Sequence, residues 1–259
     1  MKIKMIVIDL DGTTLHKDES ISLFTIETLR KYQLKGVKIV IATSRSEASA
    51  KRYCNLLNPD AAILYGGAIG FVGNHIIHKA QIEAHEAIRY IRKCINMDCI
   101  DYIRVSGEHE DFSNNPNLNF ENMEFGHYKK TTFNNMPIQA VNKITICSRN
   151  IEKIKNTFEN DKICNLTLSY AGEDFHKLTH KDATKECALQ KIMAYFSITN
   201  QNVIAFGDDI SDINMLSMCG IGVAVKNANF NVKSIADEIC EENEKDGVAN
   251  FLAQNIAIL

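Results

Sequence analysis

The sequence opens with Met1–Leu15, MKIKMIVIDLDGTTL, in which an apolar run ends abruptly in two carboxylates. The run at Met5–Ile8 has no polar alternation, so it predicts a strand buried on both faces of a parallel sheet. Asp9 and Asp11 follow two positions apart, and side chains at that spacing in an extended segment point the same way. Their converging charges favour a divalent cation. The competing interpretation is a plain turn, because Asp-Gly is a common turn pair and Gly12 permits a sharp bend.

The composition indicates a globular protein with one large domain or two modest ones. The chain has 259 residues, of which 45% are hydrophobic and 24% charged. Its formal net charge of -3 offers no basic surface for nucleic acid. Its eight Cys include no CxxC pair, which favours buried free thiols in a reducing cytosol over disulfides or a zinc site. No apolar run is long enough to cross a bilayer, and a strand stands where a signal peptide would, so we expect a cytoplasmic protein.

The first 80 residues alternate strands with helices. We expect strands at 5–8, 37–42 and 61–65, with one helix after the N-cap Ser22 and another at 47–57. This order, with short connections, predicts a doubly wound parallel sheet of the α/β class. Ligands of such sheets bind beyond the carboxyl ends of the strands, where Asp9, Asp11 and Thr43 all stand.

From residue 81 the pattern changes. The expected elements are helices at 84–95 and 151–158 and strands at 102–105, 141–147 and 166–170, around a polar, irregular stretch at 113–137. This is α+β patterning, unlike the flanking segments. We therefore predict an inserted α+β domain at 81–180, and a discontinuous core made of 1–80 and 181–259.

After the insertion the first pattern resumes. Lys185 opens a helix for which Asp182 or Thr184 is the expected N-cap. A buried strand at 203–206 then runs into the acidic segment Gly207–Asp212, and it is followed by a helix at 213–218 and a strand at 222–225. Another strand end in the core therefore carries carboxylates.

Six polar side chains from these strand ends and the helix start could surround a magnesium ion and a phosphate: Asp9, Asp11, Thr43, Lys185, Asp208 and Asp212. Magnesium prefers oxygen ligands, and it screens an attacking carboxylate from a phosphate dianion. A carboxylate can act as a covalent nucleophile on phosphorus. A second carboxylate can protonate the leaving oxygen and then activate water.

These motifs resemble those of the haloacid dehalogenase superfamily of phosphatases, and within it the Cof-like group, whose large α/β cap is inserted between the second and third motifs. The matching segments are DLDGT at Asp9 to Thr13, Thr43 in IATSR, Gly66-Gly67-Ala68, Lys185 in KECAL, GDDISDINML at Gly207 to Leu216, and Asp246 to Ala249 as the closing signature. Their order covers nearly the whole chain.

The resemblance implies a role for each matching position. Asp9 is then the nucleophile, Asp11 the general acid/base and Lys185 a further catalytic residue. Magnesium is then bound by Asp9, the backbone carbonyl of Asp11 and Asp208, with Asp212 close by. The positions that contact substrate are Thr43, Ser44, Arg45, Gly67, Lys185 and Ser211.

The activity implied is a Mg²⁺-dependent phosphomonoester hydrolase that forms an aspartyl phosphate. Its substrates are small phosphorylated metabolites, sugar phosphates first among them, and the protein is a monomer or a homodimer. Three positions depart from the family pattern: Ser44 and Glu186 replace Gly, and Ser211 replaces Asn. None of the three removes a catalytic group, so they bear on rate and substrate more than on reaction type.

Other functions stay open. In a phosphomutase or phosphotransferase of the same superfamily, a sugar hydroxyl replaces water as the acceptor. A non-catalytic phospholigand-binding regulatory protein is a third reading, although such a protein has no use for both Asp9 and Asp11. A response-regulator receiver also phosphorylates an aspartate, but it is about half this length and has no insertion.

Overall fold

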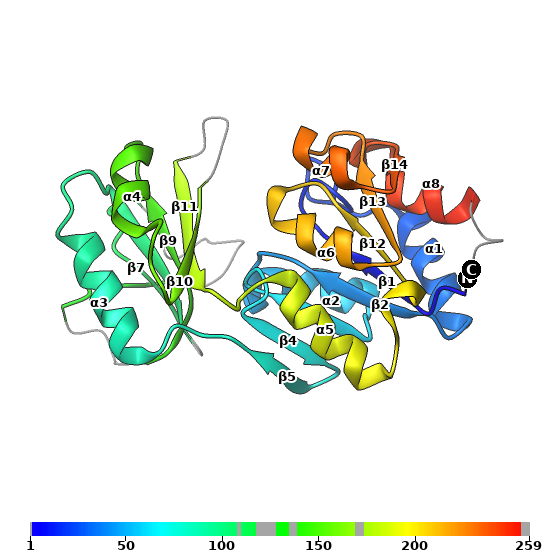
Figure 1. The fold of residues 1–259 in the computed structure, drawn as a ribbon, viewed down its shortest axis with the longest axis horizontal. Helices are drawn as coiled ribbons and strands as arrows, with labels where there is room; N and C mark the ends of the chain where they lie inside the picture. The colour runs from blue at the N-terminus through cyan, green and yellow to red at the C-terminus, as the bar shows by residue number, and fades with distance from the viewer. Residues whose placement is uncertain (1, 108–109, 118–127, 135–138, 169–173, 255–259) are drawn as a thin grey trace. The chain divides into compact units, whose positions relative to one another are not determined.

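The computed structural model describes the chain apart from residues 1, 108–109, 118–127, 135–138, 169–173 and 255–259 (Figure 1). The chain divides into two compact units: unit 1 is Met1–His78 with Thr184–Leu259, and unit 2 is Lys79–Ala183. Each unit has its own cluster of buried hydrophobic side chains. The bounds of unit 2 differ from the predicted insertion, 81–180, by two residues at the start and three at the end.

Unit 1 is built on a sheet with the strand order β14-β13-β12-β1-β2-β3-β4-β5. Its strands are β1 (Met5–Ile8), β2 (Lys38–Ala42), β3 (Ala61–Leu64), β4 (Ile69–Val72), β5 (His75–Lys79), β12 (Val203–Gly207), β13 (Ile221–Val225) and β14 (Glu238–Cys240). From β14 to β3 all neighbours are parallel. Strand β1 lies in the middle with every residue buried, as its unbroken apolar run predicts.

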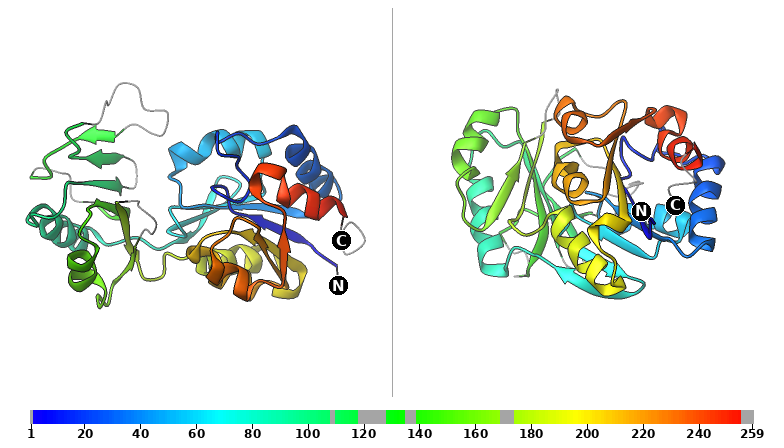
Figure 2. Two further views of the ribbon diagram at one scale, coloured as in Figure 1. Left: turned by 90° about the horizontal axis from the view of Figure 1, so that it is seen from above. Right: turned by 45° about the vertical axis from the view of Figure 1, so that its right-hand side comes forward.

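Helices cover both faces of this sheet (Figures 1 and 2). They are α1 (Leu23–Leu34), α2 (Glu47–Leu57), α5 (Lys185–Phe196), α6 (Ile213–Met218), α7 (Phe230–Ile235) and α8 (Gly247–Gln254), with 3-10 turns η1 (Asn200–Asn202), η2 (Ile210–Asp212) and η3 (Asn243–Lys245). Helix α1 contacts α2 and α8, whereas α6 contacts α5 and α7. The predicted doubly wound α/β core is therefore confirmed.

The two edges of the sheet were not predicted correctly. Strand β4 pairs with β3 antiparallel, so the sheet is mixed rather than purely parallel. Tyr65 and the two glycines after it, Gly66 and Gly67, have positive φ values of 55°, 74° and 114°, which turns the chain back on itself there. The short β14, which contains the exposed Ile239, carries too little apolar periodicity to stand out in the sequence.

Side-chain caps fix where the core helices begin. Ser22 Oγ accepts a 3.0 Å hydrogen bond from the backbone N–H of Thr25 at the start of α1, which confirms the predicted cap. Thr184 Oγ1 accepts a 3.3 Å bond from the N–H of Cys187, so Thr184 rather than Asp182 caps α5. The cap places Lys185 in the first turn of that helix.

Unit 2 has an α+β fold with the strand order β10-β11-β9-β6-β7-β8. Its elements are α3 (Ala84–Ile95), β6 (Tyr102–Gly107), β7 (Asp111–Ser113), β8 (Tyr128–Lys130), β9 (Val141–Cys147), α4 (Ile151–Phe158), β10 (Cys164–Thr167) and β11 (Phe175–His180). The stretch expected to be irregular, 113–137, includes β8, and its residues 118–127 and 135–137 lie outside the described part. The strand expected at 166–170 begins earlier, as β10, and residues 169–170 are likewise not described.

The turn between β3 and β4 packs against the start of α5. A Cβ atom added at Gly67 would lie 2.1 Å from the carbonyl carbon of Thr184, whereas one added at Gly36, which also has a positive φ, would meet nothing within 4 Å. Gly67 is thus required for the close approach of two backbone segments, one of which leads into Lys185.

These two glycines form a matched pair for a stability test. Gly36→Ala should lower the free energy of unfolding by about 1–2 kcal/mol, because only the backbone strain of the left-handed region is added. Gly67→Ala should cost clearly more, and it should also lower activity because it displaces the first turn of α5. Urea unfolding of both variants measures the difference, and equal losses would contradict the packing role of Gly67.

Candidate active site

The strand ends that carry the predicted site residues meet at the centre of the unit 1 sheet. Asp9 follows β1 and Asp208 follows β12, and these two strands are parallel neighbours in register. The backbone N–H of Asp9 donates to the carbonyl of Phe206 at 3.1 Å, which extends that ladder by one bond. Thr43 follows β2, on the other side of β1, and its side chain is fully buried.

Lys185 carries a buried ammonium that links two of the carboxylates. Its Nζ lies 2.7 Å from Asp9 Oδ1 and 2.5 Å from Asp212 Oδ1. The exposed fractions of the three side chains are 2%, 7% and 0%. Burial opposes the charged form of Lys185, but Asp212 and Asp9 outweigh it and raise its pKa well above the usual range. The ammonium is therefore charged, which a buried lysine without partners would not be.

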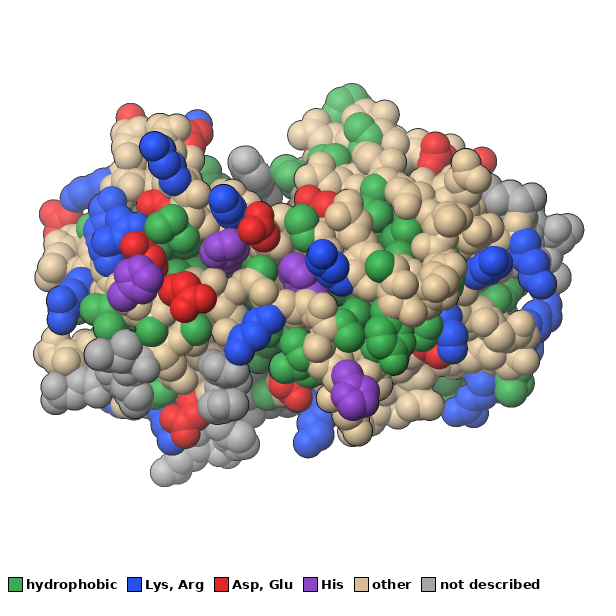
Figure 3. Space-filling model, turned by 60° about the horizontal axis from the view of Figure 1, so that its bottom comes forward, with side chains coloured by type: hydrophobic (Ala, Val, Ile, Leu, Met, Phe, Trp, Pro, Cys, Tyr) green, Lys and Arg blue, Asp and Glu red, His purple; other side chains and the backbone are tan. Residues whose placement is uncertain are grey.

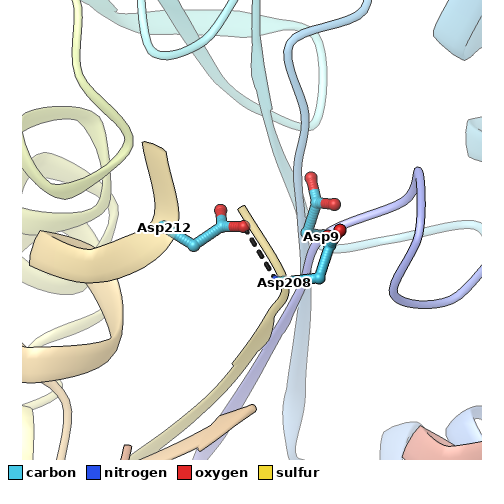
Figure 4. Close-up of side chains that lie close together, drawn as sticks. All are labelled: Asp9, Asp208 and Asp212. Carbon is cyan, nitrogen blue, oxygen red and sulfur yellow. Dashed lines mark hydrogen bonds between the residues drawn. The ribbon is translucent and has the colours of Figure 1, made fainter. Parts of the chain in front are cut away.

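Asp212 organises the loop after β12 with its second oxygen. Asp212 Oδ2 accepts a 3.1 Å hydrogen bond from the backbone N–H of Asp208 (Figure 4), and a second one, also at 3.1 Å, from the N–H of Asp209. Asp212 also stands at the N-cap position of α6, but its side chain makes no capping bond there, and Asp209 forms a capping box with it in η2. A Cβ added at Gly207 would lie 2.6 Å from that of Asp212, so only glycine fits at the end of β12.

Three carboxylates converge on one point, and together they suit a hard divalent cation. Among the described residues, Asp9, Asp208 and Asp212 each offer an oxygen within 4.8 Å of the other two (Figure 4). Burial and the charge of Asp212 raise the pKa of Asp208 to about 6. Burial likewise raises the pKa of Asp9, against the effect of Lys185, and Asp212 and Asp208 add to the rise. One ammonium cannot neutralise three carboxylates, and oxygen donors of this kind are the ligands that Mg²⁺ prefers.

Asp11 lies apart from that cluster. Its side chain is 53% exposed and is bound by Arg45, whose Nε lies 2.9 Å from Oδ2 and whose Nη2 lies 2.6 Å from Oδ1. Burial alone would lower the pKa of Arg45, but the bonds and the charge of Asp11 outweigh it and raise that pKa. The two carboxylates predicted to share the chemistry, Asp9 and Asp11, therefore have different surroundings: one is buried on an ammonium and the other is half-exposed on a guanidinium.

The remaining predicted substrate residues occupy different places. Thr43 Oγ1 accepts a 3.1 Å bond from the backbone N–H of Arg45. Ser44 lies beside the β3–β4 turn, since a Cβ added at Gly66 would be 3.6 Å from Ser44 Oγ. Ser211 donates to the exposed Asp209 at 3.3 Å, within its own turn.

Glu186, which stands where the family pattern has Gly, directs its side chain to a contact outside the cluster of Asp9, Asp208 and Asp212. Its Oε1 accepts a 3.0 Å bond from Asn214 Nδ2, which joins α5 to α6.

Two residues that support the site, Thr13 and Glu19, have no role predicted from the sequence. Thr13 Oγ1 donates a 2.8 Å hydrogen bond to Asp208 Oδ1. The position of this hydroxyl within the DLDGT motif is the feature of the sequence that could have indicated such a role. Glu19 shares the guanidinium of Arg45 with Asp11, at 3.0 Å from Nη2, and no sequence pattern marks that residue. Gly12 is also fixed by packing, because a Cβ there would lie 2.4 Å from Asp208 Oδ2.

The surface charge and the helices bear on the partners predicted from the sequence. On the face shown in Figure 3, Lys and Arg side chains are interspersed with Asp and Glu side chains. None of the helices in the described part of the chain combines the length and the apolar character that crossing a bilayer requires. A cytoplasmic location, and a monomer or homodimer, stay predictions from the sequence.

Comparison with known proteins identifies relatives along nearly the whole chain. A family model described as haloacid dehalogenase-like hydrolase matches residues 6–252. The chain is 24% identical to the 5-amino-6-(5-phospho-D-ribitylamino)uracil phosphatase YitU of Bacillus subtilis, with 98% of both chains covered. It is 27% identical to YcsE, a second 5-amino-6-(5-phospho-D-ribitylamino)uracil phosphatase of Bacillus subtilis, with 96% of this chain and 94% of YcsE covered.

Solved structures give the same picture. The HAD subclass IIB sugar phosphatase BT4131 superimposes with a TM-score of 0.84 and 27% identity, over 99% of this chain and 100% of that chain. A haloacid dehalogenase-like hydrolase from Bacteroides thetaiotaomicron has the same fold, with a TM-score of 0.85 and 23% identity over 98% and 99% of the two chains.

A doubly wound core with an inserted second unit carries these strand-end carboxylates, and the relatives along its length show that the protein is a phosphatase. The chain belongs to the haloacid dehalogenase-like hydrolase family, and it acts on phosphorylated substrates.

Cation binding by the three carboxylates can be measured without turnover. A cation that binds only the folded state at about 100 times its Kd stabilises it by about 2.7 kcal/mol. Mg²⁺ should therefore raise the thermal unfolding midpoint of the wild type, and Asp208→Asn should need far more Mg²⁺ for the same rise. Asp98→Asn removes an exposed carboxylate and should respond like the wild type. An unchanged Mg²⁺ response in Asp208→Asn would exclude Asp208 as a ligand.

Proposed function

We propose that this phosphatase is a Mg²⁺-dependent phosphomonoester hydrolase that works through an aspartyl phosphate on Asp9. The observation that carries the proposal is the buried Asp9 carboxylate, held at 2.7 Å by the Lys185 ammonium and next to the oxygens of Asp208 and Asp212. One oxygen of Asp9 is fixed by Lys185, which leaves the carboxylate as a rigid nucleophile.

The reaction divides into two displacements at phosphorus. In the first, a carboxylate oxygen of Asp9 bonds to phosphorus while the bond to the ester oxygen breaks, and Asp11 gives its proton to that oxygen. In the second, water attacks the phosphorus of the aspartyl phosphate, Asp11 takes the proton from water, and inorganic phosphate leaves. Asp9 and Asp11 then return to their starting protonation states.

The charges around Asp9 serve both steps. Asp9, Asp208 and the backbone carbonyl of Asp11 would hold Mg²⁺, which would offset the charges of the carboxylates and of the phosphate dianion. Lys185 offsets part of the negative charge of Asp9 and Asp212 in the resting protein. Asp212 keeps Asp208 in place through the backbone of its own loop.

We assign the phosphate contacts to Thr43 and Lys185, with further substrate contacts from Ser44, Arg45, Gly67 and Ser211. The substrate class we propose is a small metabolite phosphate, and sugar phosphates foremost. This is supported by the likeness to a sugar phosphatase at 27% identity and to phosphatases of a phosphoribitylamino compound. We also propose that unit 2 selects among such substrates.

Pre-steady-state kinetics test the separate roles of the two carboxylates. Asp9→Asn should abolish both the burst and the turnover, because no bond breaks without the nucleophile. Asp11→Asn, mixed rapidly with an aryl phosphate, should release about one phenol per site and then turn over slowly, since an aryl oxide leaves without a proton but water still needs the base. Steady-state loss should be about 10²–10⁴-fold, the usual contribution of general acid–base catalysis.

The same Asp11→Asn variant should lose more activity on alkyl phosphates, whose leaving group needs the proton. Equal losses on aryl and alkyl esters, without a burst, would show that Asp11 has a structural or metal-binding role instead.

A further inference from the structure

The carboxylate of Asp11 is held by a guanidinium that is itself fixed in place. Arg45 binds Asp11 through two nitrogens, and charge-assisted bonds of this forked kind set orientation as well as energy. The Arg45 side chain is only 11% exposed, against 53% for Asp11. The guanidinium carbon of Arg45 also lies 5.0 Å from the ring centre of Tyr53 in α2.

A second carboxylate, Glu19, binds the same guanidinium, at the Nη2 nitrogen that also donates to Asp11. Glu19 Oε1 accepts from Arg45 Nη2 at 3.0 Å, and Glu19 Oε2 pairs with Nη2 of Arg52. Arg52 and Tyr53 are successive residues of α2, so the Glu19 carboxylate is anchored to a helix and not only to its own loop.

Glu19 has a backbone conformation that is unfavourable for a residue other than glycine. Its φ is 62°, in the left-handed region that non-glycine residues rarely adopt. The turn is closed by the N–H of Glu19 donating to His16 at 2.9 Å and by the N–H of His16 donating to Ser20 at 3.0 Å. Tyr53 completes the anchoring, since its hydroxyl donates to the backbone carbonyl of Glu19 at 3.2 Å.

We propose that Glu19 is a positioning residue for the phosphatase reaction, which acts through Arg45 to fix the orientation of the Asp11 carboxylate. The inference rests on the proposed role of Asp11 as acid and base. The carboxylate that must first give a proton and later take one is the most exposed of the acidic site residues, so packing does not orient it. The chain Glu19–Arg45–Asp11 supplies that orientation with charged contacts.

Two simpler explanations make different predictions. An ordinary surface ion pair joins exposed, mobile side chains and contributes little, whereas Arg45 is nearly buried and Glu19 occupies a strained backbone position. If Glu19 acted only through the proposed contact of Arg45 with the substrate, and not through Asp11, its loss would weaken the binding of every phosphate ester equally. Orientation of the acid is distinguished by its dependence on the leaving group.

The test compares kcat and KM of Glu19→Gln on two kinds of ester. Its substrates are 4-nitrophenyl phosphate and the sugar phosphate that the wild type hydrolyses fastest. On the sugar phosphate, kcat should fall about tenfold, a part of the usual contribution of a general acid. On 4-nitrophenyl phosphate, the rate constant of the burst, which reports the first displacement alone, should change less than about twofold. Neither KM should rise, since phosphate binding is untouched.

Two further variants control for charge and folding. Glu47→Gln removes one negative charge at the start of α2, outside the Glu19–Arg45–Asp11 chain, and should leave both esters unaffected. Arg45→Lys keeps the charge but loses the fork, and it should reproduce the leaving-group dependence of Glu19→Gln. Thermal unfolding of each variant shows whether it is folded.

A double-mutant cycle closes the test. In an Asp11→Asn background, Glu19→Gln should have no further effect on the sugar phosphate, because residues that act through one group are not additive. Three results would overturn the positioning role of Glu19: additive losses of activity in the double variant, equal losses on both esters, or a raised KM on both. They do so provided that Asp11→Asn still shows its own dependence on the leaving group. If Asp11→Asn itself lacked that dependence, the proposed function would fail, and the role of Glu19 with it.

Discussion

The ion pair of the Lys185 ammonium with Asp9 and Asp212 is the interaction on which the rest of the site depends. A buried lysine is stable only when its charge is matched, and here each bond joins a different part of unit 1. Asp9 ends the central strand β1, Asp212 belongs to the turn after β12, and Lys185 begins α5. Removal of any one partner leaves an uncompensated buried charge, so the fold of these three segments and the electrostatic surroundings of Asp9 depend on each other.

Glycines at three strand ends and turns make that arrangement possible. Gly12 lies against the Asp208 carboxylate, Gly207 against the Asp212 side chain and Gly67 against the backbone of Thr184, each closer than a Cβ allows. The surplus of negative charge in the cluster is then a property of the fold, and a divalent cation is its natural complement. Asp11 lies outside that cluster, and its carboxylate is bound instead by Arg45, whose guanidinium also contacts Glu19.

The sequence predicts most of this because local patterns determine it. Apolar runs that end near Asp9, Thr43 and Asp208 place these residues at the carboxyl edge of a parallel sheet, independently of how the rest of the chain folds. The surroundings of Asp11 could not be predicted, because Glu19 reaches Arg45 only through a left-handed turn and contacts with α2 that no short-range pattern specifies. The antiparallel edge at β4 and the short β14 were missed for the same reason: pairing there depends on a turn and on neighbours rather than on periodicity.

The central claim is that Asp9, fixed by Lys185, carries the phosphoryl group. The most direct measurement mixes Asp11→Asn with an aryl phosphate and Mg²⁺, quenches the mixture with borohydride, which reduces an acyl phosphate to an alcohol, and maps the product by peptide mass spectrometry. The account predicts homoserine at position 9 in an amount equal to the phenol burst, and none in Asp9→Asn. A burst without reduction at position 9, or reduction at Asp208 or Asp212 instead, would contradict it.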